Sequence, residues 1–339
     1  MNTRRELLLK GSAALSGFAL GLPLIANPAR AADKVTMLTA NGFQPDFIEL
    51  MNGYSGKHFA KQGIDAEILG PHGTSQAGQL LMAGKAQFAR FSGLDLVKVV
   101  GKANAPFVSI STMSQASTFH IVSTAEKPIN KAEDLKGKKI GIVSIGGSTD
   151  TYVEMILRKV GIPSDSVEKR AVGNSLAAYQ FVKRGVIDCC VLSLPVVMAV
   201  QSLNEKIVSW NTDRYVPMPG QCYLTTKDII KENPDLVVRF LRGLRGSVEE
   251  LMSNPAQPLF KRAAKDFEIP NLENIDFQAH ILKEVINQQW LSEGRENLMR
   301  NVPKLWHDAA ETAHILGADS FGDGSSVYTN KYVDAAMKS

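Results

Sequence analysis

The sequence predicts an α/β fold of two lobes, each a mostly parallel sheet flanked by helices. Short apolar runs alternate with segments of helical periodicity, which is typical of parallel strands covered by helices on both faces. The same order of elements also occurs twice along the 339 residues. In each passage a strand, a polar loop and a helix ending at glycine are repeated, and a further strand, loop and helix follow. No Gly/Ser-rich linker separates the passages, so we expect chain crossings between the lobes.

The first passage is read from its turn and capping residues. Pro45 suits the first turn of a helix, and Gly63 and Gly84 suit the residue that ends one. Thr74 or Ser75 caps the second helix. Strands are predicted at 35–39, 66–69, 87–91 and 107–111, and helices at 45–62, 76–83 and 92–100.

The second passage and the C-terminal region follow the same logic. Gly161 and Gly185 end helices, as Gly63 does in the first passage. A strand at 222–225 is predicted to return to the first lobe, and the chain is helical after it. Strands are predicted at 139–143, 167–172 and 187–192, and helices at 150–160, 176–183, 193–202, 233–253, 274–290 and 303–316.

These elements define the predicted domains. Lobe one should contain residues 32–118 and 220–339, and lobe two residues 119–219. The chain should cross between the lobes near 115–121 and again near 215–223.

Residues 1–31 are predicted to be an export signal. The pair Arg4-Arg5 precedes an apolar run at 13–26, and Ala29-Arg30-Ala31 is a small-x-small cleavage site. The arginine pair is similar to a Tat signal, with an ordinary Sec signal as the alternative. Cleavage near Ala31 would place the mature protein in the periplasm. No cysteine lies near the cleavage site, so we expect no lipid anchor.

Composition excludes several classes of protein. Without the predicted signal the formal net charge of +4 falls to about +1, which argues against nucleic acid as a partner. No apolar stretch after Ala26 has the roughly 18–20 residues of a membrane span, so we expect a soluble mature chain. The odd count of cysteines, Cys189, Cys190 and Cys222, excludes a full disulfide framework and leaves their redox state open. No metal-ligand spacing occurs, and we expect neither metal nor cofactor.

Four passages together carry a resemblance to a known family. They are 59–67 (FAKQGIDAE), 80–87 (LLMAGKAQ), 134–141 (DLKGKKIG) and 233–244 (NPDLVVRFLRGL). In this order they resemble the periplasmic substrate-binding proteins of ABC importers, in the NMT1/THI5-like group that includes nitrate, sulfonate, taurine and pyrimidine-precursor binders. The resemblance implies a monomer, not an enzyme, whose lobes close on a small solute and deliver it to a permease in the inner membrane.

The candidate ligand site lies where the strands end. Ligands of open α/β sheets bind beyond the carboxyl ends of the strands, where helix N-termini offer free N–H groups. Hydroxyls and amides in these loops suit an anion, Phe43 and His72 could stack on a planar ring, and Arg90 could pair with a carboxylate or sulfonate. The candidate residues are Asn41, Phe43, Gln44, His72, Thr74, Ser75, Arg90, Ser92, Gly93, Gly147, Ser148, Thr149, Asn174 and Ser193.

Three alternatives stay open at this point. The ligand is a small organic anion, such as a sulfonate or carboxylate, or else a planar aromatic compound such as a pyrimidine or thiamine precursor. A periplasmic sensor subunit would share the fold and differ only in its partner. A pyrimidine-synthesising enzyme of the same family would use a cysteine cluster and an active-site histidine, and here only Cys189 and Cys190 are adjacent.

Overall fold

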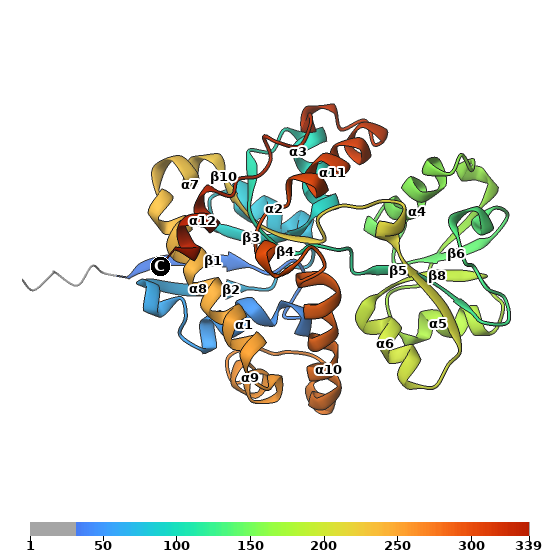
Figure 1. The fold of residues 1–339 in the computed structure, drawn as a ribbon, viewed down its shortest axis with the longest axis horizontal. Coiled ribbons are helices and arrows are strands. Elements are labelled where there is room, and N and C mark those ends of the chain that lie inside the picture. Colours follow the sequence, from blue (N-terminus) through green and yellow to red (C-terminus); the bar gives the residue numbers. More distant parts are fainter. Residues whose placement is uncertain (1–31, 339) are drawn as a thin grey trace, which may run out of the picture. The chain divides into compact units, whose positions relative to one another are not determined.

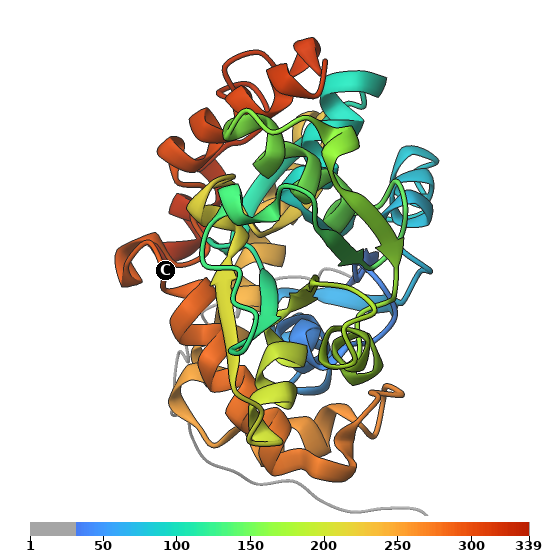
Figure 2. The ribbon, with the colours of Figure 1, turned by 90° about the vertical axis from the view of Figure 1, so that its right-hand side faces the viewer.

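The computed structural model describes residues 32–338, so the predicted export signal at 1–31 lies outside the described residues. Two five-stranded sheets organise the chain, and helices flank both of them (Figure 1). Viewed from the side of the second sheet, the green-to-yellow segment that builds this sheet lies in front of the rest of the chain (Figure 2). The predicted two-lobed α/β class is confirmed.

The first sheet has the strand order β2-β1-β3-β10-β4. β1 pairs in parallel with both β2 and β3, and β10 runs antiparallel between β3 and β4. All eight residues of β4 are buried, although it lies at the edge of the sheet. The strands are β1 (Asp33–Leu38), β2 (Ile64–Leu69), β3 (Phe88–Ser92), β4 (Phe107–Ser114) and β10 (Gln221–Thr226).

The second sheet repeats this arrangement in the order β7-β6-β8-β5-β9. β6 pairs in parallel with β7 and β8, and β5 runs antiparallel between β8 and β9. Each sheet is therefore mostly parallel, as the sequence predicts, and each also contains one reversed strand that the sequence analysis does not predict. The strands are β5 (Phe119–Thr124), β6 (Lys139–Ile142), β7 (Glu168–Ala171), β8 (Cys189–Ser193) and β9 (Ile207–Asn211).

The reversed strand of each sheet follows directly on a passage through the other sheet. The chain leaves the first sheet after β4 and enters the second at β5; it leaves the second after β9 and returns at β10. We call residues 115–118 the first crossing and residues 212–220 the second crossing. The Gly220 N–H donates to the Ser114 carbonyl at 2.8 Å, and Asn211 Nδ2 donates to the Ser117 carbonyl at 2.8 Å, so the crossings run side by side.

The helices close both faces of the sheets. The predicted long helix at 45–62 is interrupted: one 3-10 turn precedes α1 and another follows it. Helix α10 ends in a π-helical turn at Ile286–Trp290. The helices are α1 (Ile48–Ser55), α2 (Thr74–Met82), α3 (Gly93–Ala103), α4 (Ser148–Lys159), α5 (Leu176–Lys183), α6 (Leu194–Ser202), α7 (Lys227–Glu232), α8 (Pro234–Ser253), α9 (Ala256–Ala263), α10 (Ile275–Val285), α11 (Pro303–Ile315) and α12 (Lys331–Met337).

Helix α8 provides much of the first core. Its apolar stripe, which the sequence predicts from helical periodicity, packs against α1 and α12. The Phe240 ring stacks on Phe88 of β3 with ring centroids 4.0 Å apart. It also stacks on Phe59, with ring centroids 5.8 Å apart. No helix in residues 32–338 combines the length and apolar character needed to cross a bilayer.

Candidate functional site

Hydroxyl side chains gather where helices begin after the strands. Ser92 ends β3 and caps α3, its Oγ accepting the Asp95 N–H at 3.0 Å. Thr74 is the first residue of α2, and Ser148 is the first residue of α4. Ser193 precedes α6 in the same way. The repeated strand–loop–helix order thus places hydroxyls at four helix starts, two in each sheet's segment.

The carboxylate of Asp95 brings three of these hydroxyls together. Ser92 Oγ donates to Asp95 Oδ2 at 2.8 Å, and Thr74 Oγ1 donates to the same oxygen at 3.2 Å. Ser148 Oγ, from the segment of the second sheet, donates to Asp95 Oδ1 at 3.2 Å. We call Thr74, Ser92, Asp95 and Ser148 the hydroxyl cluster. It joins the starts of α2, α3 and α4 through one negative charge.

A second contact lies one turn further along the same two helices. Lys98 Nζ on α3 donates to Thr151 Oγ1 on α4 at 2.8 Å. Burial lowers the pKa of Lys98, while the nearby Asp95 charge acts in the opposite direction. Helices α3 and α4 therefore meet through an acid, a lysine and two hydroxyls. Beside the loops of the second sheet, Ile145 and Leu176 expose apolar side chains.

Two further candidates pair with each other. Asn174 Nδ2 donates to Ser193 Oγ at 2.9 Å, and the Ser193 N–H donates to Asn174 Oδ1 at 3.0 Å. This pair connects the loops before α5 and α6. No hydrogen bond joins it to the hydroxyl cluster within the described residues.

The remaining loop candidates have local contacts. Phe43 packs on Phe267 with ring centroids 5.1 Å apart, and the backbone N–H of exposed His72 donates to Gln76 Oε1. Thr149 is buried, and its Oγ1 accepts the Val143 N–H at 2.9 Å. Partly exposed Gly147 N-caps α4 with φ −78°. Asn41 and Gln44 lie in the loop after β1, and Ser75 is the second residue of α2.

Arg90 lies in the core. It is 1% exposed, its Nη1 donates to the Asp46 carbonyl at 2.8 Å, and its Nε lies 3.3 Å from Glu49 Oε1. Its guanidinium stacks over the Phe47 ring at 4.5 Å. Because every one of these partners belongs to the first passage, we assign Arg90 to the support of the loop before α1 and leave it out of the proposed site.

Gly93 is also buried by its own surroundings. Its N–H donates to the Pro219 carbonyl at 3.1 Å, and a Cβ atom here would lie 2.1 Å from that oxygen. The missing side chain therefore makes room for the second crossing, not for a ligand.

Sequence reasoning missed Asp95 and Lys98. Both follow the candidate loop on α3, and their spacing of three residues places them on one helix face. An acidic residue three positions after a serine is also typical of helix capping. The pattern in the sequence therefore does not distinguish a ligand-site carboxylate from an ordinary capping residue. Recognition of its role requires the position of Ser148 on α4.

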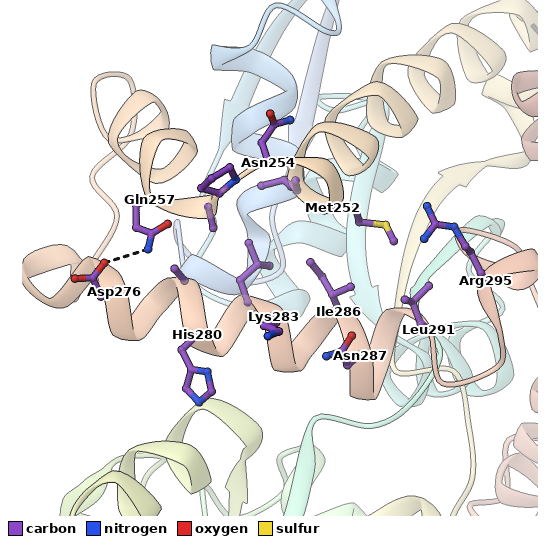
Figure 3. Close-up of a pocket in the computed structure, with 15 residues that line it drawn as sticks. Met252, Asn254, Gln257, Asp276, His280, Lys283, Ile286, Asn287, Leu291 and Arg295 are labelled. Carbon is purple, nitrogen blue, oxygen red and sulfur yellow. Dashed lines mark hydrogen bonds between the residues drawn. The ribbon is translucent and has the colours of Figure 1, made fainter.

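A groove of about 620 Å³ lies elsewhere, between the end of α8, α9 and α10 (Figure 3). Gln257 Nε2 donates to Asp276 Oδ1 at 3.1 Å at one end of it. Other polar lining side chains, Asn254, Lys283 and Arg295, are exposed. None of the candidate residues lines this groove, and we do not assign the ligand to it.

The three cysteines are free and fully buried. Burial raises the pKa of Cys189 and of Cys222 to about 12, and that of Cys190 well above its usual value. Within residues 32–338 no group of His, Cys, Asp and Glu side chains could hold a metal ion.

We therefore expect a thiol reagent at neutral pH to modify none of the cysteines in the native protein, because thiolate is the reacting form. All three should react after denaturation in guanidinium chloride. Absorbance of released thionitrobenzoate measures this directly. Rapid native modification of one thiol would contradict the buried arrangement.

Comparison with known proteins finds a matching family and relatives whose names refer to thiamine biosynthesis or to pyrimidine phosphate synthesis. A family profile described as NMT1/THI5 like matches residues 44–258. A Haemophilus influenzae protein named for thiamine biosynthesis is 24% identical over 160 residues, 47% of this chain, so the match spans only 50% of that relative. A 4-amino-5-hydroxymethyl-2-methylpyrimidine phosphate synthase of Saccharomyces cerevisiae is 21% identical over 332 residues, covering 89% of this chain and 88% of the synthase.

Several solved structures share the fold, and two of them are periplasmic binding proteins. The periplasmic aliphatic sulphonate-binding protein SsuA of Escherichia coli has a TM-score of 0.64 at 16% identity, covering 87% of this chain and 94% of its own. The periplasmic nitrate-binding protein NrtA of Synechocystis has a TM-score of 0.63 at 13% identity, covering 90% and 88%. At these identities the likeness concerns the fold, the two-lobed periplasmic-binding-protein architecture.

Proposed function

Because the chain belongs to the NMT1/THI5-like family, we propose that it is the extracytoplasmic solute-binding component of an ABC importer. In this proposal residues 1–31 direct export, the two lobes close on a small solute, and the closed form docks on a permease in the inner membrane. The observation that carries the proposal is the hydroxyl cluster, because it joins helix starts from both sheets at the strand ends where α/β folds bind ligands.

The Asp95 carboxylate defines the ligand chemistry that we propose. A free anion placed beside it would meet a like charge in a partly buried site, which is unfavourable. Within the described residues Oδ1 accepts one hydrogen bond, from Ser148, and an ionised carboxylate oxygen can accept a further donor. We therefore propose a small solute that presents an N–H group to Asp95, which favours an amino compound over a simple sulfonate or nitrate.

The ligand also needs an apolar or planar part. Ile145 and Leu176, with exposed fractions of 65% and 39%, lie on the loops beside α4 and α5. Phe43 lies in the first loop of the other sheet. An aminopyrimidine and an aliphatic amino acid analogue both fit this description, and the synthase relatives named above favour the pyrimidine. The fully buried cysteines offer no exposed nucleophile for a synthase reaction.

A thermal-shift screen tests the proposal. It compares amino-substituted pyrimidines, taurine and small amino compounds with alkyl sulfonates and nitrate. A ligand at 100 times its Kd stabilises the protein by roughly 2.7 kcal/mol, which corresponds to a Tm increase of about 4 °C for a chain of this size. Stabilisation by N–H-bearing compounds supports the proposal; stabilisation by nitrate or alkyl sulfonates alone would contradict the assignment to Asp95.

Asp95→Asn is the matched variant. Losing a hydrogen bond to a charged group should cost roughly 1.5–3 kcal/mol of binding, so Kd for the hit should rise about tenfold to a hundredfold in calorimetry. Ser148→Ala should raise it less. The exposed Asp165→Asn and Ser253→Ala serve as controls in the two lobes, and both should leave Kd unchanged. If Asp95→Asn binds as tightly as the native chain, the ligand contacts other residues.

A further inference from the structure

An acid joins the two crossings. The Ser117 N–H of the first crossing donates to Asp213 Oδ2 of the second at 2.6 Å. Asn211 Oδ1 accepts the Asp213 N–H at 2.7 Å, and Asn211 Nδ2 donates a hydrogen bond to the Ser117 carbonyl. Thr212 Oγ1 adds a contact to Ser117 Oγ at 3.0 Å. The segment between the sheets is thus held by one carboxylate and the polar groups that position it.

The second oxygen of this carboxylate has no partner. Asp213 Oδ1 is buried, and no hydrogen bond reaches it from the described residues. An unpaired buried carboxylate oxygen is costly when the group is charged. Because the crossings are where the chain passes from one sheet to the other, any rotation of the lobes changes the surroundings of this oxygen.

The groups that face Asp213 do not neutralise it. Glu293, which follows the π-helical turn, adds a second negative charge, and Tyr152 of α4 contributes a hydroxyl whose pKa the Asp213 charge helps to raise. The Ser117 N–H favours the ionised form, but burial outweighs it and raises the pKa of Asp213 from 3.8 to about 7.

We propose that Asp213 is a protonation switch between the crossings: its neutral form favours the packed crossings seen here, and its ionised form favours a conformation in which water reaches the carboxylate. The proposal rests on the lobe motion proposed above. As an acid with a raised pKa, Asp213 stabilises the packed state most at acidic pH. That contribution is lost progressively as pH rises through about 7.

The switch is connected to the hydroxyl cluster through α4. Tyr152 is 2% exposed and lies one turn after Ser148, and the charges of Asp213 and Asp95 both act on its hydroxyl. Tyr152 therefore lies between the second crossing and the hydroxyl cluster, within the range of both charges. For a switch acting fully through one proton, the open-to-packed ratio can change by up to tenfold for each pH unit.

Small-angle X-ray scattering of the ligand-free protein between about pH 5.5 and 8.5 tests the switch. We expect the radius of gyration to increase with a midpoint near pH 7 in the native chain. In Asp213→Asn, which cannot ionise, it should stay at the acidic value throughout. Asp165→Asn removes an exposed acid that lies between α4 and β7, and this variant should keep the native transition. A flat native profile, or a transition that persists in Asp213→Asn, overturns the proposal.

A second measurement tests the proposal even if Asp213→Asn fails to fold. Hydrogen exchange of the Ser117 amide in the native chain, corrected for the intrinsic pH dependence of exchange, should lose protection above about pH 7. Asp213→Glu, which remains titratable, should retain that loss. Constant protection across the range overturns the proposal. Because both readouts use ligand-free protein, they can fail while the ligand screen succeeds, and the reverse also holds.

Discussion

Arg90→Met is expected to lower the free energy of unfolding by about 3–5 kcal/mol, because it removes one partner of a buried ion pair and leaves the other. Glu49 is 0% exposed; its Oε1 lies 3.3 Å from Arg90 Nε and accepts a hydrogen bond from the Tyr223 hydroxyl at 2.8 Å. No side chain or backbone group among residues 32–338 donates a hydrogen bond to its second oxygen. Urea unfolding followed by circular dichroism measures the loss.

The loss should depend on pH in a definite direction. Burial raises the pKa of Glu49, and Arg90 opposes that effect. Without Arg90 the carboxyl is more costly to ionise, so the stability difference between variant and native chain should shrink as pH falls and Glu49 is protonated. The double variant Arg90→Met/Glu49→Leu should recover part of the loss, since no buried charge remains.

The control separates two roles for Arg90. Arg184→Met removes an exposed arginine at the C-cap of α5 and should change the free energy of unfolding by less than about 1 kcal/mol. If Arg90→Met unfolds like the native chain but no longer binds the hit of the ligand screen, Arg90 contacts the ligand, and our assignment to the core is wrong.

Arg90 also marks a limit of sequence reasoning. Alternation along β3 cannot tell which neighbour a charged strand residue meets, because Glu49 and Asp46 lie more than forty positions earlier. The predicted strands of the two sheets, by contrast, follow from local apolar runs and the glycines after helices, and their bounds differ from the structure by at most three residues. Local chemistry decides those elements, whereas the partner of Arg90 depends on tertiary packing.

Two strands were missed for a related reason. β5 (Phe119–Thr124) and β9 (Ile207–Asn211) are neighbours in the second sheet, and each lies next to a crossing. The predicted crossing at 115–121 includes the first three residues of β5, because no turn residue separates the crossing from the strand. Their pairing with each other becomes visible only in the assembled sheet.

Candidate loops were predictable, while their contacts were not. Ser148 and Ser92 were selected because they begin helices after strands, and the structure places both on Asp95. Asp95 itself is not among the candidates that the sequence predicts. Gly93 is a candidate because it lies at a helix start after a strand, but the atom that fills the space beside it is the Pro219 carbonyl oxygen. Sequence identifies a position without a side chain and cannot identify what fills the space.

Gly220→Ala is expected to destabilise the protein by about 3 kcal/mol, the upper part of the range for overpacked sites. A Cβ atom at Gly220 would lie 1.9 Å from the Ala116 carbonyl oxygen and 2.7 Å from its carbon. Both atoms belong to the backbone of the first crossing, so no side-chain rotation relieves the clash. The crossings must separate, which also breaks the hydrogen bond from the Gly220 N–H to Ser114.

Gly78→Ala is the matched control. Gly78 is buried in α2, where a Cβ atom would meet the Phe91 ring at 3.4 Å, an ordinary contact. That variant should be neutral or gain up to about 1 kcal/mol from helix propensity. Urea unfolding compares the two variants, and scattering at about pH 5.5 should give Gly220→Ala a larger radius of gyration than the native chain. Native stability together with a native radius of gyration would contradict the close packing of the two crossings at Gly220, on which the burial of Asp213 Oδ1 depends.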